Sequence, residues 1–174
     1  ADSAADLSNI TSNITNMTAQ FTQNQTFTGN LNGKSATVDD GVTVTAAAAD
    51  VTGDTIAAGN TGNIAVTALD ATLDANLSGL SSVAGTVTAA FDNNGTFTGN
   101  LGTAVVTVAD TKTMTAAYSV LNGKSVNHDG SETGQGLVVT INAADSAADL
   151  SNITSNITNM TAQFTQNQTF TGNL

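Results

Sequence analysis

The chain of 174 residues contains no cysteine, no proline and no tryptophan, and its three basic side chains are all lysines. Without cysteine it has no disulfide framework, no thiol nucleophile and no cysteine-based metal cluster. Its 14 acidic side chains outnumber the basic ones and give a formal net charge of −11. We therefore expect no nucleic-acid partner, because phosphate contacts require clustered cations.

Long apolar segments are also missing from the sequence. No apolar run approaches the roughly 18 residues that a membrane helix needs, so we expect no membrane insertion. The first residues lack the basic and apolar regions of a signal peptide, and we expect Ala1 to open a mature protein or a fragment.

What the sequence does contain is an internal repeat. Residues 1–31 recur without a single change at 144–174, so the chain holds one complete unit, 1–143, and then the start of a second unit. The phrase TFTGNL occurs at 26–31, 96–101 and 169–174, and its even spacing divides the unit into two diverged halves. A fixed period of this kind indicates a tandem array.

A shorter period runs within each half. An apolar residue, a threonine and then alanine or isoleucine return at similar intervals, beginning at positions 17, 44, 66, 87, 114, 139 and 160. These segments alternate polar and apolar side chains, which is typical of strands, and Gly, Asn and Asp between them favour turns. The fold class we predict is all-β, a parallel β-solenoid of about six coils per 143-residue unit, with Val and Ala inside and Thr outside.

Serial small β-sandwich modules are the alternative architecture, because short strands separated by turn signals are also found in sandwiches. The halves of about 70 residues are short for a sandwich, which typically needs about 100. The solenoid is therefore the preferred prediction.

The outward threonines are the first candidate site. In a solenoid we expect them to stack at about 4.8 Å, and a regular hydroxyl array can order water or bind a surface ligand. The residues of this predicted ladder are Thr18, Thr45, Thr67, Thr88, Thr115 and Thr140. The competing interpretation is the ordinary polar face of a β-sheet.

Four aspartates form the second candidate site. Asp50 and Asp54 have the same spacing as Asp70 and Asp74, and the second pair follows the first after about one expected coil. A solenoid with that period would bring the two pairs to one edge, where carboxylates suit calcium. The chain has neither an EF-hand spacing nor a calcium-binding nonapeptide, and no other cofactor is indicated. The alternative is a set of solvated acidic loops that keep the protein soluble.

The single histidine, His128, lies in a polar loop, Asn127–Glu132, with no nucleophile in an evident pairing. No Gly-x-Ser-x-Gly nucleophile motif is present. We therefore predict that the protein is not an enzyme.

The composition and the phrases ADSAADLSNIT and VLNGKSV resemble the repeat regions of giant bacterial cell-surface proteins and adhesins. The resemblance implies an extracellular, cell-surface location and a structural role in extending or cohering at the cell surface. The alternative is an adhesive or ice-binding module that uses the outward threonines, with a glycan or another surface ligand as its partner. The absence of calcium nonapeptides departs from that pattern. Because the segment at 144–174 has the sequence of the segment at 1–31, we also expect head-to-tail contacts between copies.

Overall fold

The computed structural model describes residues 3–10 and 16–174. The chain is almost entirely β, with 41% strand and 10% helix, and its parallel sheets form a β-solenoid of about seven turns. This confirms the predicted fold class. The parallel pairing excludes the sandwich alternative, whose sheets are antiparallel.

The chain divides into two compact units. Unit 1 comprises Ala1–Ala68, Ala75–Ala89 and Asn100–Ala104, and unit 2 comprises Leu69–Asp74, Ala90–Gly99 and Val105–Leu174. Each unit is built from short parallel strands that successive coils contribute in turn.

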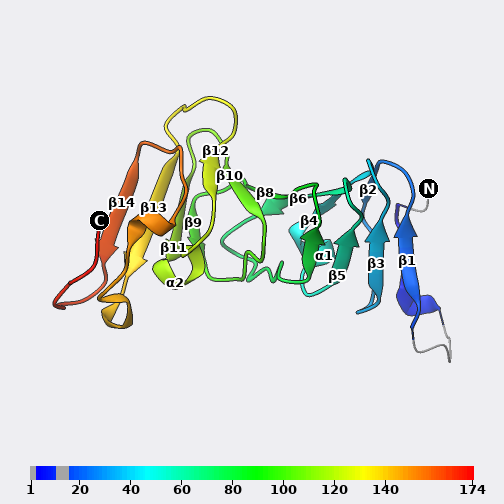
Figure 1. Cartoon of the computed structure of the whole chain (residues 1–174), viewed down its shortest axis with the longest axis horizontal. Helices are drawn as coiled ribbons and strands as arrows, with labels where there is room; N and C mark the ends of the chain where they lie inside the picture. Colours follow the sequence, from blue (N-terminus) through cyan, green and yellow to red (C-terminus); the bar gives the residue numbers. More distant parts are fainter. Residues whose placement is uncertain (1–2, 11–15) are drawn as a thin grey trace. The chain divides into compact units, whose positions relative to one another are not determined.

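In unit 1, consecutive strands of the chain alternate between two sheets, because each coil supplies one strand to each sheet. The first sheet has the order β1 (Thr18–Phe21), β3 (Ser35–Val38), β5 (Thr55–Ala58) and β7 (Leu80–Ser82). Strands β1, β3 and β5 are labelled in Figure 1. The second sheet contains β2 (Gln25–Phe27), β4 (Thr43–Ala47) and β6 (Asn63–Leu69). Strand β8 (Val87–Phe91) begins in unit 1 and ends in unit 2.

Unit 2 repeats this plan. One sheet has the order β9 (Gly95–Phe97), β11 (Thr113–Ala117), β13 (Gly136–Ile141) and β14 (Met160–Phe164). Strands β10 (Val105–Val108) and β12 (Val126–His128) pair with each other and belong to the sheet that contains β2, β4, β6 and β8. The short helices are α1 (Ala48–Val51), α2 (Tyr118–Leu121), and the 3-10 turns η1 (Leu7–Asn9), η2 (Ala143–Asp145) and η3 (Leu150–Asn152).

The core consists of inward columns of small and branched side chains. Ala36, Ile56 and Leu80 occupy matching positions on β3, β5 and β7, and all three are buried. The strands alternate buried and more exposed positions, as a solenoid wall with one dry face requires. Such a narrow interior explains why Val, Ala and Leu are the commonest buried residues.

The strand register differs from the predicted stacking of equivalent tripeptides. Val44 pairs with Ile64, and Val66 pairs with Ala46, so the two VTA phrases are two residues out of step. In unit 2, Met114 pairs with Leu137 in the same way. A two-residue shift keeps every side chain on its own face, so core burial tolerates it. The expectation that the same tripeptide stacks in each coil is therefore wrong at these strands.

Candidate functional site

The TFTGNL phrase closes a coil by pairing with an earlier segment of the chain. The Asn30 N–H donates to the Ala5 carbonyl (3.0 Å), and the Leu7 N–H donates to the Asn30 carbonyl (2.8 Å). The same parallel bridge joins Asn76 with Asn100 and Asp149 with Asn173. The phrase recurs because each occurrence performs the same closure.

Glycine is needed in this closure. A Cβ on Gly29 would collide with the Ala5 carbonyl, and a Cβ on Gly172 would collide with the Ala148 carbonyl. The backbones therefore approach each other more closely than any side chain allows.

Each of the two identical segments supplies an edge strand, and the two strands belong to different sheets. β1 is the edge strand of its sheet and pairs with β3, which follows it in the chain. β14 has the same sequence, is also an edge strand, and pairs with β13, which precedes it. Each copy therefore shows one half of the contacts that a coil in the middle of an array would make.

The burial of the two copies differs accordingly on the side of the following coil. Leu31 is 1% exposed beneath the coil that follows it, whereas its counterpart Leu174 is 69% exposed. Phe21 is buried and Phe164 is exposed. We call Phe21, Phe27 and Leu31, and their counterparts Phe164, Phe170 and Leu174, the downstream face.

The burial is reversed on the side of the preceding coil. Ile10 is 48% exposed, whereas its counterpart Ile153 is 5% exposed. Leu7 is half-buried and Leu150 is buried. We call Leu7 and Ile10, and their counterparts Leu150 and Ile153, the upstream face.

The coil that precedes the second copy in unit 2 accounts for the burial of Leu150 and Ile153. The Gly123 N–H donates to the Asn152 carbonyl (3.1 Å), and the Thr154 N–H donates to the Lys124 carbonyl (3.0 Å). The Tyr118 hydroxyl also lies within hydrogen-bonding distance of both the Asp149 N–H (3.2 Å) and the Asp149 carbonyl (3.4 Å). Backbone pairing with the coil before it thus holds the upstream face of the second copy.

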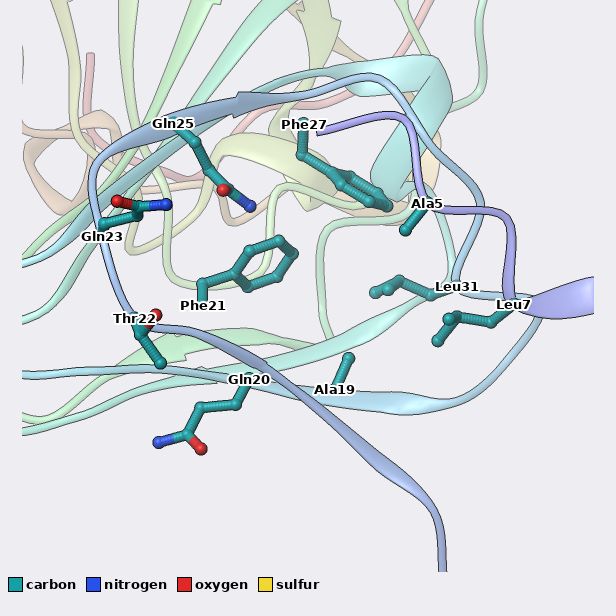
Figure 2. Close-up of a pocket in the computed structure, with 10 residues that line it drawn as sticks. All are labelled: Ala5, Leu7, Ala19, Gln20, Phe21, Thr22, Gln23, Gln25, Phe27 and Leu31. Carbon is teal, nitrogen blue, oxygen red and sulfur yellow. The ribbon is translucent and has the colours of Figure 1, made fainter. Parts of the chain in front are cut away.

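The first copy carries a pocket of about 290 Å³, whose lining includes Leu7 of the upstream face and all three residues of the downstream face. Figure 2 shows the Phe21 and Phe27 rings facing it, with Leu7 and Leu31 on one side and glutamine side chains on the other. In the second copy, Ile141 of β13 pairs with Phe164, the counterpart of Phe21. The strand β1 that contributes Ala19, Gln20 and Phe21 to the pocket is therefore the counterpart of the strand that β13 pairs with in the second copy.

The six threonines of the predicted ladder do not form one column. Thr45 pairs with Ala65 and Thr67 pairs with Ala47, because the register of β4 and β6 is shifted by two residues relative to the repeated phrase. In the same way Thr115 pairs with Val138 and Thr140 pairs with Ala117. Thr18 belongs to a different sheet from these four, on β1, and Thr88 lies on β8. The prediction of a single threonine ladder is wrong.

A shorter hydroxyl column lies instead on the first sheet of unit 1. Thr18, Ser35 and Thr55 occupy matching positions on β1, β3 and β5, and all three are exposed. Beside it runs a second outward column, Gln20, Thr37, Ala57 and Ser81. We call the first column the hydroxyl face. Sequence reasoning missed it because serine replaces threonine on β3 and the intervals between the three positions are not those of the repeated tripeptide.

The predicted calcium aspartates have separate local roles. Asp50 lies in α1, and burial raises the pKa of Asp54. Asp70 accepts hydrogen bonds from the Thr72 hydroxyl and N–H (both 2.8 Å), which lower its pKa. The Thr98 hydroxyl donates to Asp74.

The interval between Asp54 and Asp74, on which the calcium prediction relied, is not the stacking interval at this point of the chain. Ile56 pairs with Leu80, and a Cβ on Gly79 would meet the Asp54 carbonyl, so the segment at Gly79 lies beside Asp54. Within residues 3–10 and 16–174, no group of three or more His, Cys, Asp or Glu side chains is placed to hold a metal ion. Calcium binding by these aspartates stays a prediction.

His128 lies at the end of β12, near contacts that fasten a loop. The backbone N–H of His128 donates to the Asn156 Oδ1 (2.8 Å). The imidazole Nδ1 is buried without a hydrogen-bond partner. Glu132 accepts hydrogen bonds from the Thr158 N–H (2.6 Å) and hydroxyl (2.5 Å), which hold its pKa below the usual range. The hydrogen bonds between Glu132 and Thr158 tie the 129–135 loop to the last coil. That the protein is not an enzyme stays a prediction.

No protein-family model matches the chain, and neither a curated protein nor a solved structure matches it. In the described residues, no helix has the length and apolar character needed to cross a membrane.

Proposed function

We propose that the chain is a structural repeat segment of an extracellular fibre, stalk or cell-surface filament, in which solenoid units stack head to tail. The observation that carries this proposal is the complementary exposure of the two identical segments, 1–31 and 144–174. The first copy buries its downstream face and exposes Ile10, whereas the second copy buries its upstream face and exposes Leu174. A segment that is fully buried only between two neighbours suits an array better than an isolated domain.

The chemistry of the chain supports a passive rod. Parallel strands join successive coils through backbone hydrogen bonds, so cohesion along the axis does not depend on disulfides. The net charge of −11 makes neighbouring rods repel one another and favours solubility. Such a polymer holds a terminal domain away from a surface without requiring a catalytic site.

Electron microscopy of purified tandem arrays tests the rod. Six coils per unit at about 4.8 Å each predict an axial length of roughly 29 Å per 143-residue unit. Arrays of two, four and eight units should therefore lengthen linearly by that increment. Flexible beads, or a length that does not scale with unit number, would overturn the proposal. Surface proteolysis of the source cells checks the extracellular location.

An adhesive or ice-binding role is the second candidate, and the hydroxyl face favours it. Three exposed hydroxyl side chains at strand spacing, Thr18, Ser35 and Thr55, present a regular polar array. Thermal hysteresis and glycan-array binding would test this role with Thr55→Val, and Thr43→Val on the other sheet is the matched control. Activity lost only in Thr55→Val supports the role, and inactivity of the unaltered chain excludes it.

A further inference from the structure

We infer that two copies of this chain join by coil exchange: residues 1–31 of one copy take the place of residues 144–174 in the other, pairing β1 of the first with β13 of the second. The inference rests on the proposed head-to-tail stacking and specifies which segment moves and which strands meet.

Sequence identity makes the exchange possible. Residues 1–31 and 144–174 are the same, so the incoming segment can form every contact that β13 now makes with β14. Val138 pairs with Thr161 and Thr140 pairs with Gln163. The counterparts of Thr161 and Gln163 are Thr18 and Gln20, which predicts the pairs Val138–Thr18 and Thr140–Gln20 between copies.

Exchange changes which copy of the segment is buried on each face. In the resident segment the downstream face is open, with Phe164 and Leu174 exposed. The incoming segment is followed by its own β3 and β4, which pair with β1 and β2 and already cover Phe21 and Leu31. After exchange the incoming segment is buried on both faces and the displaced copy on neither, so the total burial is unchanged. The conformational entropy that the displaced copy regains favours the exchange.

The pocket at the first copy fits this arrangement. In the pairing of β13 with β14, Ile141 lies opposite Phe164. After exchange, Ile141 of the second copy lies opposite Phe21, one of the two rings that face the 290 Å³ pocket. Exchange thus pairs β13 with the strand whose Ala19 and Phe21 line this pocket.

Simple end-to-end docking lacks this support. Docking without displacement would set β1 against β14, which places Thr18 beside Thr161 and stacks one coil on an identical coil. No described strand pair repeats that arrangement, because β1 pairs with β3 and β14 pairs with β13. Exchange instead reproduces pairings that the chain already contains.

Engineered cysteines test the exchange directly, because the chain has none of its own. Val138→Cys and Thr18→Cys are made in separate full-length chains, one of them labelled with ¹⁵N, and the mixture is oxidised mildly. We expect about tenfold more mixed disulfide than with Val138→Cys and Thr55→Cys, because only adjacent strands bring cysteines within bonding distance. Equal yields for the two mixtures would overturn the inference.

A chain locked against exchange gives the second test. Val138→Cys combined with Thr161→Cys in one chain joins β13 to its own β14 when oxidised. Sedimentation velocity should show association of the reduced chain and its loss on oxidation, while the single variant Val138→Cys associates in both states. Association that is unchanged by the lock indicates simple docking and overturns exchange.

A third measurement avoids cysteines, in case the locked chain folds poorly. Thr161→Ser changes the mass of peptides from the second copy, so hydrogen exchange can distinguish them from the first copy. As concentration rises, amides of residues 160–164 should lose protection. Unchanged protection at concentrations where the chain associates would contradict displacement. These tests of exchange are independent of the electron-microscopy test of the rod. If exchange is absent, covalent arrays can still lengthen by the same increment per unit, so the two proposals can fail separately.

Discussion

Phe21 and Phe164 occupy the same position in identical segments and make the same ring contact, yet they differ in exposure. Phe21 packs edge-on against Phe27 at 5.3 Å, and Phe164 packs edge-on against Phe170 at 5.2 Å. Phe21 is only 5% exposed, whereas Phe164 is 41% exposed. The ring contact is therefore the same in the two copies, and the difference in exposure comes from the neighbouring coil.

This pair provides a matched test of stability. Phe21→Ala should lower the free energy of unfolding of its coil by about 3–5 kcal/mol, because it leaves a cavity in the core. Phe164→Ala should cost much less, since much of that ring already contacts solvent. Denaturant unfolding of both variants measures the difference, and equal destabilisation would contradict the assigned burial.

Gly172 and Gly29 give opposite expectations for coil exchange. Gly172→Ala should loosen the resident segment, because the new Cβ collides with the Ala148 carbonyl, and should increase association. Gly29→Ala disturbs the incoming segment at Ala5 and should decrease association. Sedimentation velocity at matched concentrations measures both variants. Changes of the same sign would show that the two copies play equivalent roles in association.

Gln135 is a buried polar side chain that the loop depends on. It is 0% exposed, its amide donates to the Asp110 Oδ1 (2.7 Å), and its Oε1 accepts from the Thr133 N–H (2.6 Å). Gln135→Leu should destabilise the loop by about 1–3 kcal/mol, because it removes the hydrogen bonds that Gln135 makes with the Asp110 carboxylate and the Thr133 N–H.

Gln163→Leu, at an exposed position of β14, is the control and should change stability little. Hydrogen exchange of residues 129–136 measures the loop in both variants. Equal protection of this loop in Gln135→Leu and the unaltered chain would rule out the assigned role.

The hydrogen bonds between Glu132 and Thr158 predict that the stability of the last coil depends on pH. They lower the pKa of Glu132 in the folded state below the ordinary value of 4.5. The contribution of the carboxylate to stability is therefore present above pH 4.5 and is lost as the pH falls through the lowered folded pKa.

Because Glu132 is the only glutamate in the chain, its side-chain carbonyl resonance can be assigned without ambiguity. An NMR titration should show its midpoint below 4.5. In Glu132→Gln, the exchange rate of the Thr158 amide should lose the acid-dependent increase attributable to this carboxylate. A midpoint at or above 4.5 would contradict the hydrogen bonds described here.

The strand register could not be predicted from the tripeptides. Val66 and Val44 have the same neighbours in the repeated phrase, but Val66 pairs with Ala46. Alternation of polar and apolar residues specifies which face a side chain occupies, and a slip of two residues leaves that face unchanged. The predicted threonine ladder failed for this reason, and the hydroxyl face of Thr18, Ser35 and Thr55 was missed.

The sequence by itself determined the repeat, the all-β class and the parallel solenoid, because unchanged copies and a recurring strand period can be read without coordinates. Only the tertiary structure decided the register of the coils and the burial of each copy of the repeated segment. Identical sequences have identical local preferences, so nothing within the segment distinguishes Leu31 from Leu174. Their exposures of 1% and 69% follow from which neighbouring coil packs against each one.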